Sequence, residues 1–510
     1  MANPDVAAAR HAFEALLEEA ANSLAERRYE EAARKVQAAA NAAFLRHPGI
    51  FYSGKAEAVL GEISKACLPI GNSRRIIAPH RTPHVLHVLT QAHLPGGHTK
   101  LAQNWIASDA GSRHSVVLTQ QLSQPVPESL LNSVAASNGQ MWVLDENQGF
   151  IKRAGALREI AQEFDWIVLH VHPFDAIPLI AWGGSTEHAP IIHLNHADHL
   201  FWIGAAVPDL VANIRPSGYR TSNTRRGLEQ AANFVLPIPL VDGQDPLPAR
   251  NTAKARLNLP DDCQLALTVA SSYKFNSVGE MDYVKLHLPL LDRCPRLRIL
   301  VVGPSRNNKY WKDSARLTEG RIQAVGIQND LSDYLAAADV YLDSTPFGSL
   351  TSLLEAGLAE VPCCSWRPHQ SSILACDDVS FDGLRYAVTY ESCEEYWEQV
   401  LAYLDDPAIA TSASQELQAS IIKHHINDGW RATLNEAYLL ALRRAEARPH
   451  NPPNVRDIEE RESDRILLAM QGGFIDNPPR PSDYFAARKK RGLLTRIKRS
   501  LKKRIGAEWS

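Results

Sequence analysis

Short apolar runs alternate with helical patterns along most of this chain, and this alternation limits the folds that it can adopt. The first five runs begin at His84 and read HVLHVLT, SVVLT, MWVLDE, WIVLH and PIIHL. Each is separated from the next by enough residues for a crossover helix. Such an order specifies a parallel sheet. We therefore predict a doubly wound α/β unit over residues 79–240.

The same alternation restarts after the proline-rich stretch LPIPLVDGQDPLPAR, with the runs QLALTVA, LRILVVG, RIQAVG, DVYLD and VPCCSW. A chain of 510 residues with 45% hydrophobic content is too long for one core and should divide into two or three domains. We predict a second Rossmann-like unit over residues 245–446, closed by a last helical stretch, with the join near residues 237–250.

The segments outside these two units have different patterns. Residues 1–78 place Phe13, Leu16 and Leu17 at helical spacing and predict a helical hairpin. It resembles one tetratricopeptide unit, but a repeat array needs about three copies, so we favour a helical flank packed on the next domain. Residues 447–487 are polar and proline-broken, which predicts a flexible linker.

The C-terminal segment, residues 488–510, is strongly basic. It has ten Lys or Arg between positions 488 and 504 and no acid among them. Its apolar residues recur at every fourth position, which gathers them on one helical face. This pattern is typical of a helix that binds an anionic membrane surface, here through residues 488–505. A solvated tail, or one that touches nucleic acid, is the alternative.

Composition excludes several other classes of protein. The formal net charge of -3 gives no global argument for nucleic-acid binding, so we predict no nucleic-acid partner. The seven cysteines are odd in number and lack paired spacing, which fits reduced thiols. The N-terminus lacks a signal-peptide pattern, and no stretch approaches the roughly 18 apolar residues of a membrane span. We expect a cytoplasmic protein, peripheral at the inner membrane face if the tail binds lipid.

The segment DVYLDSTPFGSLTSLLEAG carries the strongest functional signal. An apolar strand followed by a small-residue turn and a helix directs free backbone N–H groups at one spot, which favours an anion. Gly348 would let the backbone approach closely, and Ser349, Thr351 and Ser352 could donate to a diphosphate. Glu355, one turn into the helix, could accept hydrogen bonds from both ribose hydroxyls. An ordinary strand-to-helix turn is the alternative.

This segment resembles the donor loop of the glycosyltransferase-B superfamily, including families 1 and 4. Retaining members carry two glutamates eight positions apart, whereas here Phe347 stands at the first position and only Glu355 is present. The Thr351-Ser352 pair is more similar to O-GlcNAc transferase and related cytoplasmic N-glycosyltransferases, which are inverting. The resemblance covers roughly residues 84–440. It implies two Rossmann-like domains facing a cleft (GT-B), with a UDP or GDP sugar as substrate and no cofactor.

Two further loops fit the same donor site. Lys274 follows the first strand of the second unit, where a basic residue in the resembling families neutralises the leaving diphosphate. Ser272, in the same loop, is assigned to the donor site with it; a lysine in a loop is otherwise often only solvated. Gly97 follows Gly96 between a strand and a helix and resembles the glycine loop that approaches the donor phosphates. A tight turn that needs a positive φ explains it equally well.

Histidines follow two strands of the first unit and supply candidates for a general base. His172 and His196 are both predicted at the carboxyl ends of strands, where ligands bind in α/β sheets. An inverting enzyme needs a base for the acceptor proton, and histidine titrates in the right range. For each, a structural hydrogen bond is the alternative.

A metal site is the rival interpretation of the second cluster. His193, His196, Asp198 and His199 are ligand types, but they lack a known zinc spacing, and the resembling superfamily generally needs no metal. We therefore predict no metal.

The sequence thus predicts a glycosyltransferase, of hexosyltransferase type, that moves a sugar from a nucleotide-diphosphate donor. The acceptor could be a glycan, a lipid-linked glycan or a protein, as in cell-surface polysaccharide or glycoconjugate synthesis. The alternatives are a sugar-nucleotide epimerase of the same fold and a non-catalytic scaffold that binds nucleotide sugars.

Overall fold

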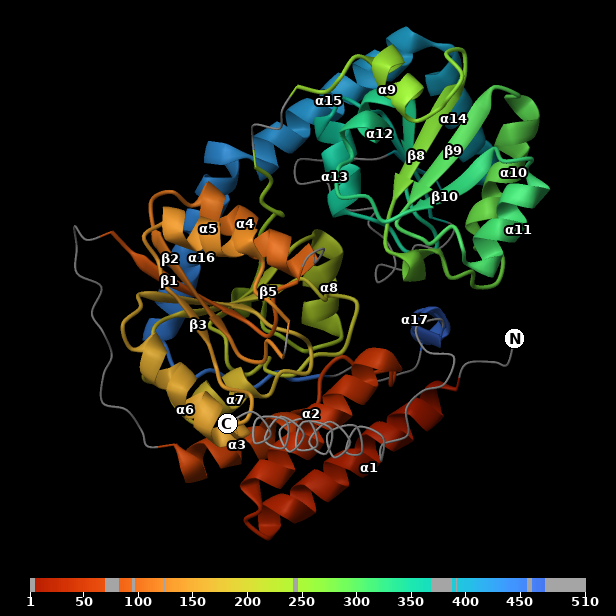
Figure 1. The fold of residues 1–510 in the computed structure, drawn as a ribbon. Helices are drawn as coiled ribbons and strands as arrows, with labels where there is room; N and C mark the ends of the chain where they lie inside the picture. The colour runs from red at the N-terminus through yellow and green to blue at the C-terminus, as the bar shows by residue number, and fades with distance from the viewer. Residues whose placement is uncertain are drawn as a thin grey trace, which may run out of the picture.

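The computed structural model describes residues 5–68, 82–93, 97–122, 124–241, 246–367, 388–390, 392–455 and 461–472. They form two parallel sheets, each covered by helices, and an additional layer of N-terminal helices (Figure 1). The predicted α/β fold of two Rossmann-like doubly wound domains is confirmed. The predicted basic tail and Gly96 lie outside the described residues.

The first domain contains a seven-stranded parallel sheet in the order β3-β2-β1-β4-β5-β6-β7. All five predicted runs form strands, and the two short strands β6 and β7 extend the sheet beyond the prediction. Its strands are β1 (His84–Leu89), β2 (Arg113–Leu118), β3 (Met141–Val143), β4 (Trp166–His170), β5 (Ile191–Asn195), β6 (Leu210–Asn213) and β7 (Asn233–Val235). Its helices are α4 (Gly97–Ser108), α5 (Glu128–Ala136), α6 (Phe150–Ala161), α7 (Ile177–Trp182) and α8 (Pro216–Thr224).

The second domain contains a six-stranded parallel sheet in the order β10-β9-β8-β11-β12-β13. Its strands are β8 (Gln264–Val269), β9 (Leu297–Val302), β10 (Ile322–Gly326), β11 (Val340–Leu342), β12 (Cys363–Trp366) and β13 (Val388–Tyr390). Its helices are α9 (Arg250–Arg256), α10 (Tyr283–Arg293), α11 (Lys309–Leu317), α12 (Ser332–Ala337), α13 (Thr351–Leu358), α14 (Cys393–Asp405) and α15 (Pro407–His425). In each sheet the strand order reverses beside the first strand, which places a ligand-binding crevice at the carboxyl ends.

The central strands are apolar because both of their faces are covered. In β1, Leu86 and Val88 pack in the core that the first domain shares with the N-terminal helices, whereas Val85 packs in the core on the opposite face. Strand β4 is buried at all of its positions. Parallel strands that are buried on both sides read as continuous apolar runs, and this made them recognisable in the sequence.

The N-terminal flank consists of α1 (Val6–Ala25), α2 (Tyr29–Leu45) and α3 (Gly54–Cys67). The predicted hairpin is α1 with α2, and α3 adds a third helix. Phe13 and Val36 belong to the same core as the first sheet, so the flank packs on that domain. Glu30 also accepts hydrogen bonds from the backbone N–H groups of Phe150 and Ile151, at 2.8 and 2.9 Å, and so caps α6.

The last helical stretch divides into α15 and α16 (Asn427–Glu446). Asn427 has a positive φ of 48°, and the chain turns there from the second domain toward the first. The Trp430 indole donates to the Pro237 carbonyl at 2.7 Å, and the Tyr438 hydroxyl donates to Asp109 Oδ2 at 3.1 Å. Helix α16 therefore packs on the first sheet and ties the two domains together.

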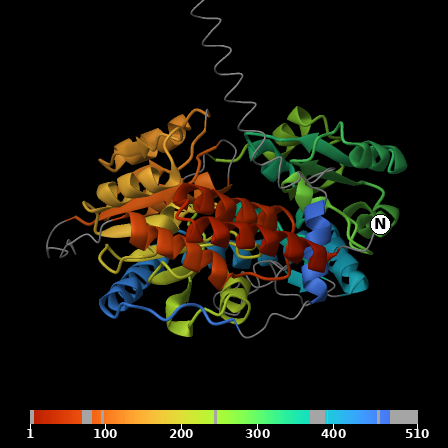
Figure 2. The ribbon, with the colours of Figure 1, turned by 90° about the horizontal axis from the view of Figure 1, so that it is seen from below.

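Helix α17 (Glu462–Gly472) lies within the predicted flexible linker, residues 447–487, and corrects that prediction over its own residues. Its Asp464 is wholly buried, with His47 at 2.8 Å and Arg225 at 3.0 Å. The Asn276 side chain donates to the Met470 carbonyl at 3.0 Å, so α17 also contacts the second domain. Figure 2 shows the flank helices extending across the first domain toward α17. These anchors come from distant parts of the chain, and the local composition gives no sign of them.

Among the helices of the described residues, none combines the length and the apolar character needed to cross a bilayer.

Candidate functional site

The loop after β11 is organised by one buried carboxylate. Asp343 Oδ1 accepts from the backbone N–H groups of Ser344 and Ser349, both at 2.8 Å, and from the Ser349 hydroxyl at 2.7 Å. Its other oxygen accepts from the Ser365 hydroxyl at 3.1 Å and pairs with Arg367. These contacts hold the loop in one shape, so Asp343 is a positioning residue that the sequence analysis missed.

This loop leads into α13, whose first turn has no side-chain cap. Leu350 takes a left-handed φ of 53°, a strained conformation that tends to occur at functional sites, and no side chain caps the helix. The first backbone N–H groups of a helix have no partner inside the helix, so they can bind an anion. Thr351 and Ser352 are half-buried at this position.

In this conformation Ser349 holds the loop together, whereas the sequence predicted that it donates to a diphosphate. A carboxylate accepts only, so the Ser349 hydroxyl donates its proton to Asp343, and its oxygen also lies 2.7 Å from the Tyr341 hydroxyl. Its proton is therefore committed inside the protein, and a direct contact from this hydroxyl to a diphosphate stays a prediction.

Lys274 lies against the donor loop, although it follows a different strand, β8. Its ammonium group donates to the Gly348 carbonyl at 2.8 Å and is 5.0 Å from the centre of the Phe347 ring. Ser272 begins the same short 3-10 helix and is exposed. The structure thus brings Lys274, Gly348 and the start of α13 together, which places a positive charge beside the candidate anion site.

Glu355 points across the cleft and forms an ion pair with Lys100 of α4. The side chain of Glu355 is 12% exposed, whereas that of Lys100 is 55% exposed. Helix α4 begins at Gly97, which has no positive φ, and a Cβ placed on this glycine would meet nothing within 4 Å. A tight turn therefore does not explain this glycine, and the space beside it is open. The two helices that follow the two glycine-containing loops thus face each other.

Four histidines from the first domain line a cavity of about 360 Å³ in this cleft, and Tyr273 and Phe347 line it from the second domain. The ring of His98 lies 5.0 Å from that of His172 and 5.9 Å from that of His196, between centroids. The His199 ring lies 4.5 Å from that of Phe347. Both candidate bases therefore reach the same cavity, and His98, which was not predicted, lies between them.

A backbone carbonyl determines which ring nitrogen of His196 carries the proton. Its Nδ1 lies 3.2 Å from the Leu194 carbonyl, which can only accept, so Nδ1 carries the proton and Nε2 keeps a lone pair. Burial and the neighbouring His98 lower the pKa of His196 to about 4. Burial, with His98 and His196, lowers the pKa of His172 to about 3. Both rings are neutral near pH 7, as a proton acceptor must be.

The candidate metal ligands serve other roles. Asp198 is paired with the Arg215 guanidinium at 2.6 Å. Burial alone would raise the pKa of Asp198, but Arg215 and His199 hold it well below its ordinary value. His193 stacks on Trp202 with 4.4 Å between ring centroids. In the described part of the chain, no three histidine, cysteine or acidic side chains are arranged to hold a metal ion.

A second group of histidines lies inside the first sheet. His114 Nε2 donates to the Asp109 carbonyl at 2.9 Å, so its Nδ1 accepts from His87 Nε2 at 2.9 Å. His87 Nδ1 then accepts from His170 Nε2 at 3.0 Å. Burial lowers the pKa of His87 and of His170 well below the ordinary value. This neutral row joins β2, β1 and β4 through their side chains, and it was not predicted.

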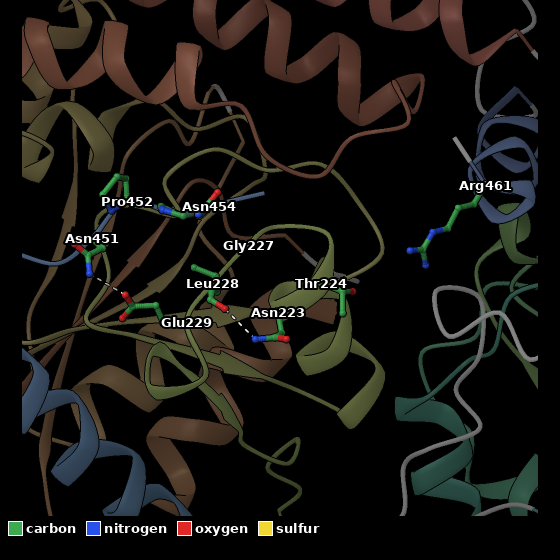
Figure 3. A pocket seen from close by; sticks show the side chains of 10 residues that line it. Asn223, Thr224, Gly227, Leu228, Glu229, Asn451, Pro452, Asn454 and Arg461 are labelled. Atoms are coloured by element: carbon green, nitrogen blue, oxygen red, sulfur yellow. Dashed lines mark hydrogen bonds between the residues drawn. The ribbon is translucent and has the colours of Figure 1, made fainter. Parts of the chain in front are cut away.

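A larger cavity, of about 990 Å³, lies elsewhere in the molecule. Figure 3 shows its lining, which comes from the end of α8 and the loop after it, from the segment that includes Asn451 and Asn454, and from Arg461 just before α17. Asn451 donates to Glu229 at 3.1 Å, and Asn223 donates to the Leu228 carbonyl at 3.0 Å. No predicted site residue lines this cavity, so the smaller cavity in the cleft is the candidate site.

Two Rossmann-like domains whose strand ends face one cleft are the arrangement of the GT-B class of fold. Solved glycosyltransferases share this fold with the chain. One from Rickettsia africae has a TM-score of 0.53 and 11% identity, over 71% of this chain and 99% of its own. A mutant O-GlcNAc transferase from Thermobaculum terrenum has a TM-score of 0.52 and 15% identity, over 82% of this chain and 81% of its own.

A third similar structure is a variant of TarM from S. aureus, solved with fondaparinux, alpha-GlcNAc-glycerol and UDP. Its TM-score is 0.50 and its identity 8%, over 70% of this chain and 100% of its own. No protein-family model matches the chain, and the comparison with curated proteins finds no match either. The chain therefore has the GT-B fold, which confirms the resemblance drawn from the donor loop at the level of the fold.

Proposed function

We propose that this protein is a glycosyltransferase that transfers a sugar from a UDP or GDP donor to an acceptor hydroxyl. The observation that carries the proposal is the uncapped start of α13, with Lys274 on one side and Glu355 one turn away. A diphosphate there would receive backbone N–H groups and a nearby ammonium charge. Glu355 would accept from the ribose hydroxyls once they displace Lys100 from its carboxylate.

The facing histidines supply the other half of the reaction. His196 Nε2 takes the proton of the acceptor hydroxyl as the acceptor oxygen bonds to the anomeric carbon. The bond from that carbon to the diphosphate breaks, and its electron pair goes to the phosphate oxygen. Lys274 and the start of α13 stabilise that charge. Phe347 offers no carboxylate to the donor sugar, which favours a direct, inverting displacement.

The proposal includes the finer predictions from the sequence. These are hexosyl transfer, a place in surface polysaccharide or glycoconjugate synthesis, and a cytoplasmic location. Attachment to an anionic membrane surface would use residues 488–505, which lie outside the described residues.

Calorimetric titration with UDP, GDP and ADP tests the donor site. UDP comes first because it was present in the solved TarM variant. We expect one diphosphate to bind, and Glu355→Gln to weaken that binding by about tenfold, equivalent to one charge-assisted hydrogen bond. Glu360→Gln, at an exposed position just after α13, is the matched control and should bind like the unaltered protein. If none of the three nucleotides binds, the proposal is wrong.

A further inference from the structure

The cavity in the cleft is apolar over most of its wall. Phe44 lies in the last turn of the flank helix α2, Phe174 and Leu200 come from the first domain, and Leu467 and Met470 come from α17. Its volume of about 360 Å³ lies at the lower end of the range for small-molecule sites. The flank, both domains and α17 therefore all contribute to this one cavity.

The wall that α17 contributes is fixed in place by polar contacts. Asp464 anchors the helix to His47 and Arg225, as described above. The Gln471 side chain accepts from the His47 backbone N–H at 2.5 Å and donates to the Phe44 carbonyl at 2.9 Å. One contact at each end thus fixes the orientation of this amide, which leaves one N–H and one lone pair for a ligand in the cavity.

The polar part of the wall consists mainly of imidazole rings. His98 Nε2 donates to the Gln91 carbonyl at 2.7 Å, which leaves Nδ1 as a lone pair. His199 Nδ1 lies 3.3 Å from the Asp198 carboxylate, which can only accept a hydrogen bond. Nδ1 therefore carries the proton, and Nε2 keeps a lone pair. Together with His196, three rings carry a lone pair that can accept a hydrogen bond from a hydroxyl group.

The cavity also lacks the groups that an anion or a polar glycan would need. Among the described residues that line it, there is no lysine, arginine, aspartate or glutamate. A phosphate would therefore meet lone pairs without a cation, which is costly in a buried site. A sugar acceptor would bury many hydroxyl groups against Phe174, Leu200 and Leu467, and each unpaired hydroxyl also costs free energy.

We propose that this cavity is the acceptor site, and that it takes an uncharged apolar alcohol or phenol. The acceptor's hydroxyl donates to His196 Nε2, and its carbon skeleton packs against Phe174, Leu200 and the α17 wall. This inference rests on the proposed function, because it assigns the acceptor for that reaction. It names an acceptor chemistry that differs from the glycans, lipid-linked glycans and proteins suggested by the sequence, and it would replace the predicted place in polysaccharide synthesis.

Saturation-transfer NMR on the full chain tests the inference with three probes: 2-naphthol, 2-naphthyl phosphate and glucose. We expect transfer to 2-naphthol alone. Leu467→Trp and Met470→Trp, each of which fills part of the cavity from α17, should each weaken 2-naphthol binding by about tenfold. Leu439→Trp is the control, because Leu439 is 55% exposed on α16 and the same large side chain there should leave binding unchanged.

A milder variant covers the case in which tryptophan prevents folding. Leu467→Ala enlarges the cavity, so a bulkier phenol such as 4-phenylphenol should gain affinity relative to 2-naphthol. The inference is overturned if glucose or the phosphate ester binds in place of 2-naphthol, or if no α17 variant changes the binding.

Titration of UDP, GDP and ADP into the same samples separates this inference from the proposed function. Nucleotide binding without 2-naphthol binding overturns the acceptor assignment only. Binding of 2-naphthol without binding of any nucleotide overturns the proposed function.

Discussion

Lowering the pH from 7.5 to 5 should destabilise this protein strongly, because several of its histidines are buried in neutral form. Burial is the main cause in each case. It lowers the pKa of His193 to about 3, and those of His287 and His425 to about 4, from 6.5. In the unfolded chain each ring protonates below pH 6.5, whereas in the folded chain it stays neutral. The stability from these rings is thus complete above pH 6.5 and is lost as the pH falls toward 4.

The size of this loss of stability follows from how far the pH lies below 6.5, the ordinary pKa of histidine. At pH 5 each ring costs about 2 kcal/mol, from 1.5 pH units at 1.36 kcal/mol per unit, so three rings cost about 6 kcal/mol. Glu57 acts in the opposite direction, because burial raises its pKa to about 7. Its protonation returns at most about 3 kcal/mol between pH 7 and pH 5, from 2 pH units at 1.36 kcal/mol per unit. For these four groups the net loss is about 3 kcal/mol, and the buried, neutral His172 and His196 add to it. Typical total stabilities are about 5–15 kcal/mol.

Urea unfolding followed by tryptophan fluorescence at pH 7.5, 6.5, 5.5 and 5, at constant ionic strength, measures this loss. His287→Gln should reduce the pH dependence by about 2 kcal/mol, because it removes one of the three rings. His11→Gln, at an exposed position on α1, should leave it unchanged. A free energy of unfolding that changes by less than about 1 kcal/mol between pH 7.5 and pH 5 would refute the reasoning.

Three further predictions concern the proposed reaction. Lys274→Ala should lower single-turnover transfer by about 100-fold while changing nucleotide affinity far less, because the charge that it stabilises develops on the leaving diphosphate; equal losses in both quantities would contradict that role. His196→Gln should abolish acceptor-dependent transfer and leave calorimetric nucleotide binding intact, since it removes the proton acceptor only. Retained transfer would instead assign the role of general base to His172. Deletion of residues 488–510 should release the protein from anionic vesicles in a flotation assay without altering nucleotide affinity, and continued flotation would exclude the tail as the anchor.

The segment that we propose as the donor site could be singled out in the sequence because its parts are local. The start of α13, the hydroxyl pair and Glu355 lie within one short segment, and Lys274 follows a strand that the apolar pattern reveals. The roles of Asp343 and His98 could not be read in this way. Each acts through partners that the fold brings from other strands, and a single buried carboxylate or histidine has no distinctive local pattern.

The two doubly wound domains follow from the sequence alone, because parallel strands buried on both faces must be continuous apolar runs. The closure of the cleft, in contrast, depends on how the folded parts meet. Helix α17 is held by Asp464 against His47 and Arg225, and Lys100 meets Glu355 from the opposite domain. These contacts join residues that are far apart in the chain, and their gain in free energy is the attraction between the partners, which offsets the cost of taking buried charges out of water. That gain exists only once the domains have packed, so no local pattern records it.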